Sequence, residues 1–136
     1  MICPELGPQA ILYVAQKLKM TPQSLEPCIG VAILVDSRIE GGLVFRNYKG
    51  HDMEIAMAFD TPRAFTKGVI KFTFSYIFGQ HDCARCTALI KRSNKRSRRL
   101  VEGLGFVLEG KARQGYDGIE DLMIYGMLKQ ECRWFK

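Results

Sequence analysis

The chain has 136 residues, a length that fits one domain with a single hydrophobic core. Hydrophobic residues make up 47% of it and charged residues 25%, as in ordinary soluble globular proteins, and no apolar run approaches the roughly 18 residues that a membrane span needs. The formal net charge of +6 is compatible with nucleic acid, an acidic substrate or a phosphorylated ligand, and does not decide among them.

The first 27 residues predict a helix followed by a loop. The helix runs from residue 7 to about residue 18, and the apolar residues on one of its faces are Ile11, Val14, Ala15 and Leu18. Residues 21–27 have the composition of a loop. The N-terminus lacks a basic stretch followed by an apolar one, so we expect no signal peptide.

Three strand candidates follow closely on one another. They are residues 29–35, 42–47 and 53–59, and turn-forming residues separate them at 36–37 and at 49–52. Short connections of this kind join neighbouring antiparallel strands. The sequence therefore predicts an antiparallel meander here.

The middle of the chain predicts a loop, a buried helix and a further strand. The loop spans residues 61–67 and contains Pro62, and residues 68–78 are apolar nearly all round, which is typical of a buried helix. We expect Gly79 to end this helix. Residues 83–90 then predict a strand.

The last third of the chain predicts a basic helix and a hairpin. Ser93 or Asn94 is expected to cap the helix, whose apolar positions are Leu100, Val101 and Leu104 and whose end is marked by Gly103 and Gly105. Residues 106–112 and 121–128 form the predicted hairpin, with a loop at 114–119.

This order of elements predicts an α/β (α+β) fold in one domain, residues 1–136. Two strands joined by a helix across residues 53–90 would lie parallel through a right-handed crossover, whereas the other sequential neighbours would be antiparallel. The prediction is a mixed, mostly antiparallel sheet flanked by helices, with an N-terminal helix and loop at 1–27 and a core at 28–134.

Five scattered cysteines indicate reduced thiols and a cytoplasmic protein, because their number is odd and no export signal precedes them. Cys83 and Cys86 have the spacing of a zinc site, but no second pair of cysteines or histidines follows. Residues three apart in a strand also point to opposite faces. We therefore expect no metal site.

Six basic residues crowd into nine positions at the start of the basic helix: Lys91, Arg92, Lys95, Arg96, Arg98 and Arg99. They form either a solvated helix face, a contact for the phosphates of a ligand, or a nucleic-acid surface. No aromatic residue interleaves the run and no nucleic-acid-binding signature surrounds it, which argues against the third interpretation.

The same region carries a family resemblance. The pattern consists of Asn94-x-x-Ser97 with Leu100, then Gly105-Phe106 and Glu109-Gly110, with Phe78-Gly79-Gln80 before it and Tyr125-Gly126-Met127 after it. It resembles the GNAT superfamily of acyl-CoA N-acyltransferases. The nearest branch holds ribosomal-protein N-acetyltransferases and their phage and prophage relatives, and the likeness covers roughly residues 28–134.

The resemblance implies a splay between the fourth and fifth family strands, with acetyl-CoA as acyl donor and its pantetheine arm beside the fourth strand. The implied cofactor-binding residues are Ile55, Ala56, Met57, Ala58, Phe59, Arg63, Phe65, Thr66, Lys67, Gly68, Asn94, Ser97 and Arg98. The resemblance also makes a homodimer plausible. Trp134 and Phe135 are apolar residues that could contribute to its interface or pack in the core.

Two features depart from the family pattern. Its phosphate loop usually has two glycines that let backbone N–H groups approach a pyrophosphate. Here residues 62–68 keep only Gly68, with Arg63 where a central glycine is expected, although Arg63 and Lys67 offer charge instead. At the N-terminus, the usual first strand and helix pair is reduced to one helix.

The resemblance also suggests catalytic groups. Glu54, at the start of the fourth family strand, is the candidate general base, and the alternative is a solvent-facing strand glutamate. His51 is a second candidate base, with a plain turn residue as its alternative. The tyrosine that many relatives use as proton donor is replaced by Val101, which leaves Ser97, Tyr125 or water; Tyr125 alternates with core residues along its strand.

The sequence thus predicts an N-acyltransferase that moves an acetyl group from acetyl-CoA to a primary amine of a protein or a small molecule. The alternative is a GNAT-fold binding or structural phage accessory protein with weak or no catalysis. A nucleic-acid-binding module is a further alternative, and we expect no membrane partner.

Overall fold

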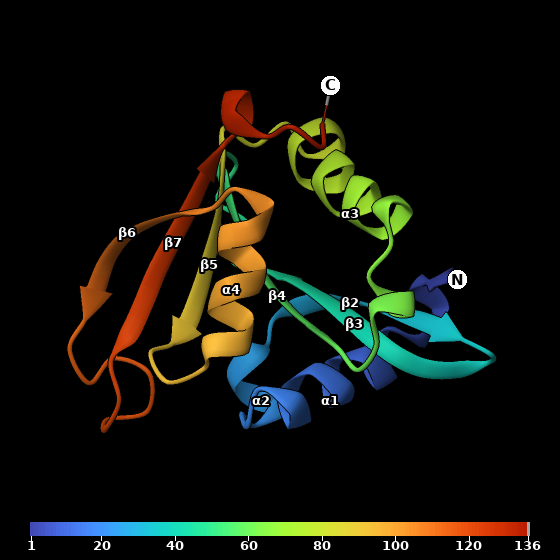
Figure 1. The fold of residues 1–136 in the computed structure, drawn as a ribbon, viewed down its shortest axis with the longest axis horizontal. Helices are drawn as coiled ribbons and strands as arrows, with labels where there is room; N and C mark the ends of the chain where they lie inside the picture. The colour runs from blue at the N-terminus through green and yellow to red at the C-terminus, as the bar shows by residue number, and fades with distance from the viewer. Residues whose placement is uncertain (136) are drawn as a thin grey trace.

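The computed structural model describes residues 1–135, which form a seven-stranded sheet with helices on both faces (Figure 1). The strands are β1 (Ile2–Cys3), β2 (Cys28–Val35), β3 (Arg38–Arg46), β4 (Asp52–Phe59), β5 (Arg85–Lys91), β6 (Val107–Ala112) and β7 (Leu122–Leu128). The helices are α1 (Gly7–Lys17), α2 (Pro22–Leu25), α3 (Lys67–Phe74) and α4 (Lys95–Leu104). The order across the sheet is β1-β2-β3-β4-β5-β7-β6, and all neighbours are antiparallel except β4 and β5.

The predicted meander is confirmed: β2, β3 and β4 pair in sequence. A two-residue turn joins β2 to β3, and both of its residues, Asp36 and Ser37, have positive φ (52° and 66°). This is the geometry that matches the natural twist of two antiparallel strands. The turn lies at the predicted residues 36–37, but β3 begins directly after it, at Arg38 instead of residue 42.

The N-terminal region holds two elements that the sequence prediction missed. Residues 2–3 form a minimal strand on the edge of β2, and the predicted loop at 21–27 contains the one-turn helix α2, capped by the Thr21 hydroxyl, which accepts a hydrogen bond from the Ser24 N–H at 3.3 Å. The expectation that this region is reduced to a single helix was therefore wrong. Elements of two and four residues are too short to show a hydrophobic period.

The buried helix does not end at Gly79 as predicted. It passes at Ser75 into wide, π-helical turns that run to Gln80. Gly79 serves packing here: a β-carbon on it would lie 3.0 Å from the ring of Phe135. Phe135 and Trp134 are partly buried and pack against the main core, and the Trp134 indole N–H donates to the Leu104 carbonyl at 2.9 Å.

The C-terminal half follows the prediction closely. Asn94 caps α4, with its side-chain oxygen accepting the Ser97 N–H at 3.1 Å. Gly105 ends the helix with φ of +111°, a conformation that glycine adopts without steric cost. The chain then forms the β6–β7 hairpin. Cys83, which we expected to lie in β5, precedes that strand by two residues.

The parallel pair β4–β5 is very short. The two strands are joined only at Asp52–Arg85, Met53–Cys86 and Glu54–Thr87, and beyond these positions they diverge (Figure 1). The predicted splay is therefore present. Beyond Glu54, the β5-facing edge of β4 has no strand partner among the described residues.

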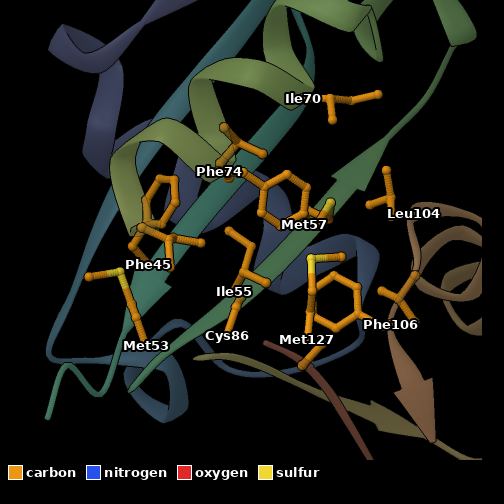
Figure 2. Packing of buried hydrophobic residues seen from close by; sticks show 14 of the residues in the cluster. Phe45, Met53, Ile55, Met57, Ile70, Phe74, Cys86, Leu104, Phe106 and Met127 are labelled. Carbon is orange, nitrogen blue, oxygen red and sulfur yellow. The ribbon is translucent and has the colours of Figure 1, made fainter. Parts of the chain in front are cut away.

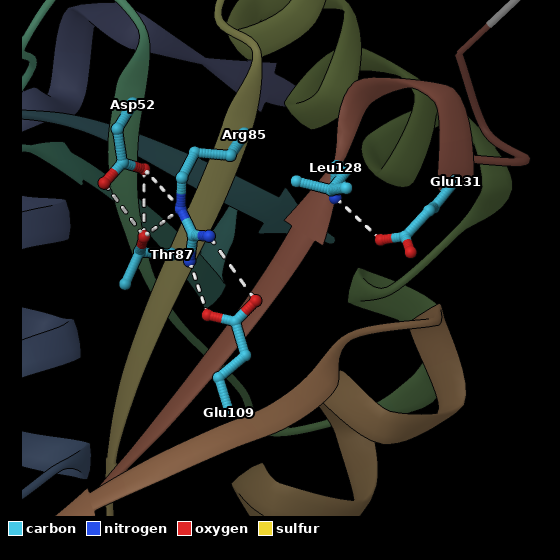
Figure 3. A network of polar contacts seen from close by, with 6 residues as sticks. All are labelled: Asp52, Arg85, Thr87, Glu109, Leu128 and Glu131. Atoms are coloured by element: carbon cyan, nitrogen blue, oxygen red, sulfur yellow. Dashed lines mark hydrogen bonds and ion pairs between the residues drawn. The ribbon is translucent and has the colours of Figure 1, made fainter.

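A polar network fixes the point where the two strands meet (Figure 3). The Thr87 hydroxyl donates to the Asp52 carboxylate at 2.9 Å. Arg85 contributes its Nε to Thr87 at 3.2 Å and forms an ion pair with Glu109 of β6 at 2.8 Å. The network thus ties β4, β5 and the β6 hairpin together at the apex of the splay.

Two cores lie on the two faces of the sheet. The larger core places α3 and α4 against one face, where Phe45, Ile55, Met57, Phe74 and Phe106 come together (Figure 2). The smaller core places α1 and α2 against the other face, on Val44 and Ala56. Side chains alternate between faces along a strand, which explains how β4 serves both cores. Among residues 1–135, no helix is long and apolar enough to cross a bilayer.

The close approach of α1 to β2 depends on glycine. A β-carbon on Gly30 would collide with the carbonyl oxygen of Gly7 and lie 2.8 Å from Ile11. We predict that Gly30→Ala lowers the free energy of unfolding by about 1–3 kcal/mol, since a backbone atom cannot move aside as a side chain can. Gly103→Ala, in an open position on α4, should raise it by roughly 0.5–1 kcal/mol. Urea unfolding of both variants checks the pair, and equal effects would contradict this packing.

Candidate active site

Two adjoining cavities follow the splay between β4 and β5. The first, which we call the Glu54 cavity, has a volume of about 260 Å³, and the second, the Phe59 cavity, has about 440 Å³. The residues that line both are Leu18, Met57, Asn94, Ser97 and Leu100. A molecule bound at the splay could therefore reach from one cavity into the other.

The Glu54 cavity lies between the sheet, the α1–α2 region and the β6–β7 loop. Its lining includes Arg46, Glu54 and Lys91, with Tyr116 from the loop. The Tyr116 hydroxyl donates to the Leu18 carbonyl at 2.8 Å, so the loop is held against the end of α1. Burial raises the pKa of Tyr116.

Glu54 is buried, with 7% of its surface exposed. It stands next to Arg46 of β3 and Thr87 of β5 in the strand register, and its carboxylate accepts no hydrogen bond from the described residues. The alternative prediction of a solvent-facing glutamate is therefore wrong. Glu54 is a charged residue that lines the cavity and forms no ion pair within residues 1–135, which makes it the strongest candidate for chemistry there.

The other two predicted catalytic residues lie elsewhere. His51 is exposed in the turn before β4 and lines neither cavity; its backbone carbonyl accepts the Ala84 N–H at 2.8 Å. Tyr125 is fully buried, and its hydroxyl accepts from Arg98 Nε at 2.9 Å and donates to Glu102 at 2.7 Å. Burial raises the pKa of Tyr125, and its hydroxyl binds β7 to α4.

The structure brings all five predicted β4 residues to the cavities. Ile55, Ala56 and Met57 line the Glu54 cavity, and Met57, Ala58, Phe59 and Phe65 line the Phe59 cavity. Asn94 and Ser97 line both. The remaining predicted residues, Arg63, Thr66, Lys67, Gly68 and Arg98, line neither.

The eroded phosphate loop has local roles in this structure. Arg63 forms an exposed ion pair with Asp36 at 3.2 Å, and the Thr66 hydroxyl caps α3 by accepting the Val69 N–H at 3.2 Å. Lys67 and Gly68 open α3.

Sequence reasoning missed several residues that line the cavities. The Phe59 cavity contains Lys17, Arg96 and Arg99, and Arg96 donates to the Phe59 carbonyl at 2.6 Å across the mouth of the splay. The basic run gave the signal for Arg96 and Arg99, but not which side of α4 each would occupy. Arg46 and Tyr116 lie far from any motif, and only the sheet register and the loop fold bring them to the Glu54 cavity.

The charges around the Phe59 cavity favour an anionic ligand. Arg96 and Arg99 have no carboxylate within 4.0 Å among residues 1–135, whereas Lys17 is paired with Asp60 at 2.7 Å. That lysine lowers the pKa of Asp60. Two unpaired guanidinium groups at one cavity are suited to phosphate oxygens.

No metal site emerges around the cysteines. Within residues 1–135, no group of three or more His, Cys, Asp or Glu side chains could hold a metal ion. Cys83 and Cys86 are both buried free thiols, and burial raises the pKa of each. They serve as small apolar core residues.

Solved structures similar to this one are acetyltransferases. A GNAT-family acetyltransferase from Bacillus anthracis matches with 27% identity over 75% of this chain and 67% of its own, at a TM-score of 0.61. Ribosomal-protein-S5-alanine acetyltransferase from Vibrio fischeri matches with 20% identity over 92% and 72%, at 0.61. The spermidine/spermine N-acetyltransferase SpeG from Vibrio cholerae matches with 16% identity over 79% and 72%, at 0.63; at such identities the likeness concerns the fold alone.

No protein-family model and no curated protein sequence matches the chain. The chain also spans only 61% to 67% of the length of several of the acetyltransferases that it matches. The likeness therefore rests on three-dimensional structure: the short parallel pair, the splay and the flanking helices are those of the GNAT fold.

The Tyr125 hydroxyl gives a test of local structure. We predict that Tyr125→Phe lowers the free energy of unfolding by about 1 kcal/mol, because Arg98 and Glu102 both lose a partner. The matched control is Tyr48→Phe, which removes only an exposed contact of 3.4 Å and should have almost no effect. Urea unfolding measures both, and an unchanged stability for Tyr125→Phe would contradict its structural role.

Proposed function

We propose that this chain, which has the GNAT fold, is an N-acyltransferase that transfers an acetyl group from acetyl-CoA to the primary amine of a protein or a small molecule. One observation carries the proposal. The splay joins a cavity lined by the buried residue Glu54, whose carboxylate forms no ion pair with the described residues, to a second cavity lined by Arg96 and Arg99, whose guanidinium groups form none either. A base for the amine, Glu54, and phosphate-binding groups for the donor, Arg96 and Arg99, thus line two adjoining cavities.

The donor would lie along β4. Between Ile55 and Phe59 the backbone groups on the β5-facing edge have no strand partner, so they are free to bond the amides of a pantetheine arm. Arg96 and Arg99 would hold phosphate groups at the far end of that strand. To do so, Arg96 must give up its hydrogen bond to the Phe59 carbonyl and donate to a phosphate oxygen instead.

The acceptor would enter the Glu54 cavity. Its neutral nitrogen attacks the thioester carbon, a C–N bond forms and the C–S bond breaks. The proton that the nitrogen loses passes to Glu54, directly or through water, and the leaving thiolate takes a proton. A thioester is already activated, so holding the two reactants together supplies much of the rate. The Ser97 hydroxyl lines both cavities and would donate a hydrogen bond to the thiolate.

A second candidate function is binding without catalysis, as in a phage accessory protein. The phosphate loop favours this candidate, because its Arg63 forms an ion pair with Asp36 and lines neither cavity. Nucleic-acid binding has less support, because three cations of the basic run are held within the protein: Lys91 by Glu120, Arg92 by Asp121 and Arg98 by Tyr125. A homodimer and a cytoplasmic location remain predictions.

Donor binding is tested by the melting temperature. We predict that acetyl-CoA at millimolar concentration raises it, since a ligand that binds only the native state stabilises that state. Arg96→Met should reduce the rise, whereas Lys71→Met on the exposed side of α3 should leave it unchanged. No rise for the native chain would remove the donor from the proposal.

The role of Glu54 is tested by turnover. We predict that Glu54→Gln slows amine acetylation by roughly 10²–10⁴-fold, the usual contribution of a positioned base, while the stabilisation by acetyl-CoA persists. The matched control is Glu40→Gln on β3, which lines neither cavity. Unchanged turnover in Glu54→Gln would show that another group, with His51 next to be tested, accepts the proton.

A further inference from the structure

The Glu54 cavity holds a second unpartnered charge, that of Arg46. The Arg46 Nε atom is buried and has no hydrogen-bond partner among the described residues. Buried N–H donors are nearly always paired, and leaving one unpaired is unfavourable. Arg46 itself lines the cavity and forms no ion pair among residues 1–135, so its guanidinium group can be contacted by a ligand there.

Arg46 and Glu54 stand side by side without forming an ion pair. They are directly opposite each other in the β3–β4 register, so their side chains leave the same face of the sheet. No N···O distance between them is within 4.0 Å. The Arg46 guanidinium and the Glu54 carboxylate, neighbours in one wall of the cavity, can thus both bind groups of a ligand.

Four other polar groups of this cavity already have partners. Lys91 is paired with Glu120 at 3.3 Å, and Tyr116 donates to Leu18 at 2.8 Å. The Ser24 hydroxyl donates to the Thr21 carbonyl at 2.6 Å, and the Asn94 side-chain oxygen accepts the Ser97 N–H. The two charged groups left for an acceptor are a carboxylate and a guanidinium.

We infer that Arg46 selects acceptors that carry a carbonyl or carboxylate oxygen beside the reacting amine, as an α-amino acid or the first residue of a peptide does. This inference rests on the proposed function. The amine would face Glu54, and the neighbouring oxygen would accept the Arg46 N–H. A polyamine offers no such oxygen and would bring further positive charge to a wall that already holds Arg46 and Lys91, so it fits this cavity poorly.

The test compares matched acceptors on the full chain with acetyl-CoA. L-Alaninamide carries the oxygen, isopropylamine lacks it at the same branched carbon, and putrescine stands for polyamines. We expect Arg46→Met to lower kcat/KM for L-alaninamide about tenfold or more, the usual effect of losing a hydrogen bond to a charged donor, and to leave isopropylamine almost unchanged. Comparing variant with native chain for each amine cancels the differences in amine basicity.

Two control variants accompany Arg46→Met. Arg38→Met, at the exposed far end of β3, should change neither acceptor. Arg46→Lys keeps the charge and should recover part of the L-alaninamide activity. An equal fall for L-alaninamide and isopropylamine, or putrescine as the best acceptor of the native chain, would overturn the inference. L-Alanine against L-alaninamide distinguishes a carboxylate from a carbonyl oxygen.

Failure of the proposed function is recognised separately. In that case no amine is acetylated and acetyl-CoA does not stabilise the chain. Calorimetric titration with L-alaninamide alone then decides the inference: binding that Arg46→Met abolishes supports it, and no binding to the native chain overturns it. Melting curves of each variant identify any that fail to fold, and if Arg46→Met is one of these, Arg46→Lys carries the comparison.

Discussion

The structure depends on how briefly β4 and β5 pair. Three register positions hold the two strands together, and the Asp52–Thr87–Arg85–Glu109 network locks them there. Beyond Glu54 the strands part, which leaves backbone groups of β4 free and opens both cavities. Longer pairing would give the backbone N–H and C=O groups of β4 partners in β5 and would close both cavities. The site therefore exists only because these backbone groups have no strand partner.

Side chains that alternate along β4 pack on both faces of the sheet. Its apolar residues Ile55 and Met57 anchor it to α3 on one side, while Ala56 packs under α1 on the other. Packing on both faces therefore supports the strand along the stretch where its β5-facing edge has no strand partner among the described residues. It also supports the position of Glu54 in the wall of its cavity.

Most of the fold could be predicted from the sequence, because hydrophobic periods and turn residues are local signals. Residue type alone limited the cap of α4 to Ser93 or Asn94 and its end to Gly103 and Gly105, and the structure has the cap at Asn94 and the end at Gly105. Two predictions were wrong for physical reasons. The helix α2 is only one turn long, too short to show a hydrophobic period, and Gly79 packs against the ring of Phe135, which is distant in sequence, instead of ending its helix. In the site, the β4 residues, Asn94 and Ser97 were found through a family pattern. Arg46 and Tyr116 could not be predicted, because only the sheet register and the fold of the β6–β7 loop place them at the Glu54 cavity.

The central claim is that a donor binds along the open edge of β4, and amide resonances of the labelled protein test it most directly. Titration with acetyl-CoA should shift the backbone N–H signals of residues 55–59 together with those of 94–100, and leave the β1–β2 edge unchanged. Shifts confined to the exposed cations of the basic run, or no shifts at millimolar acetyl-CoA, would contradict it.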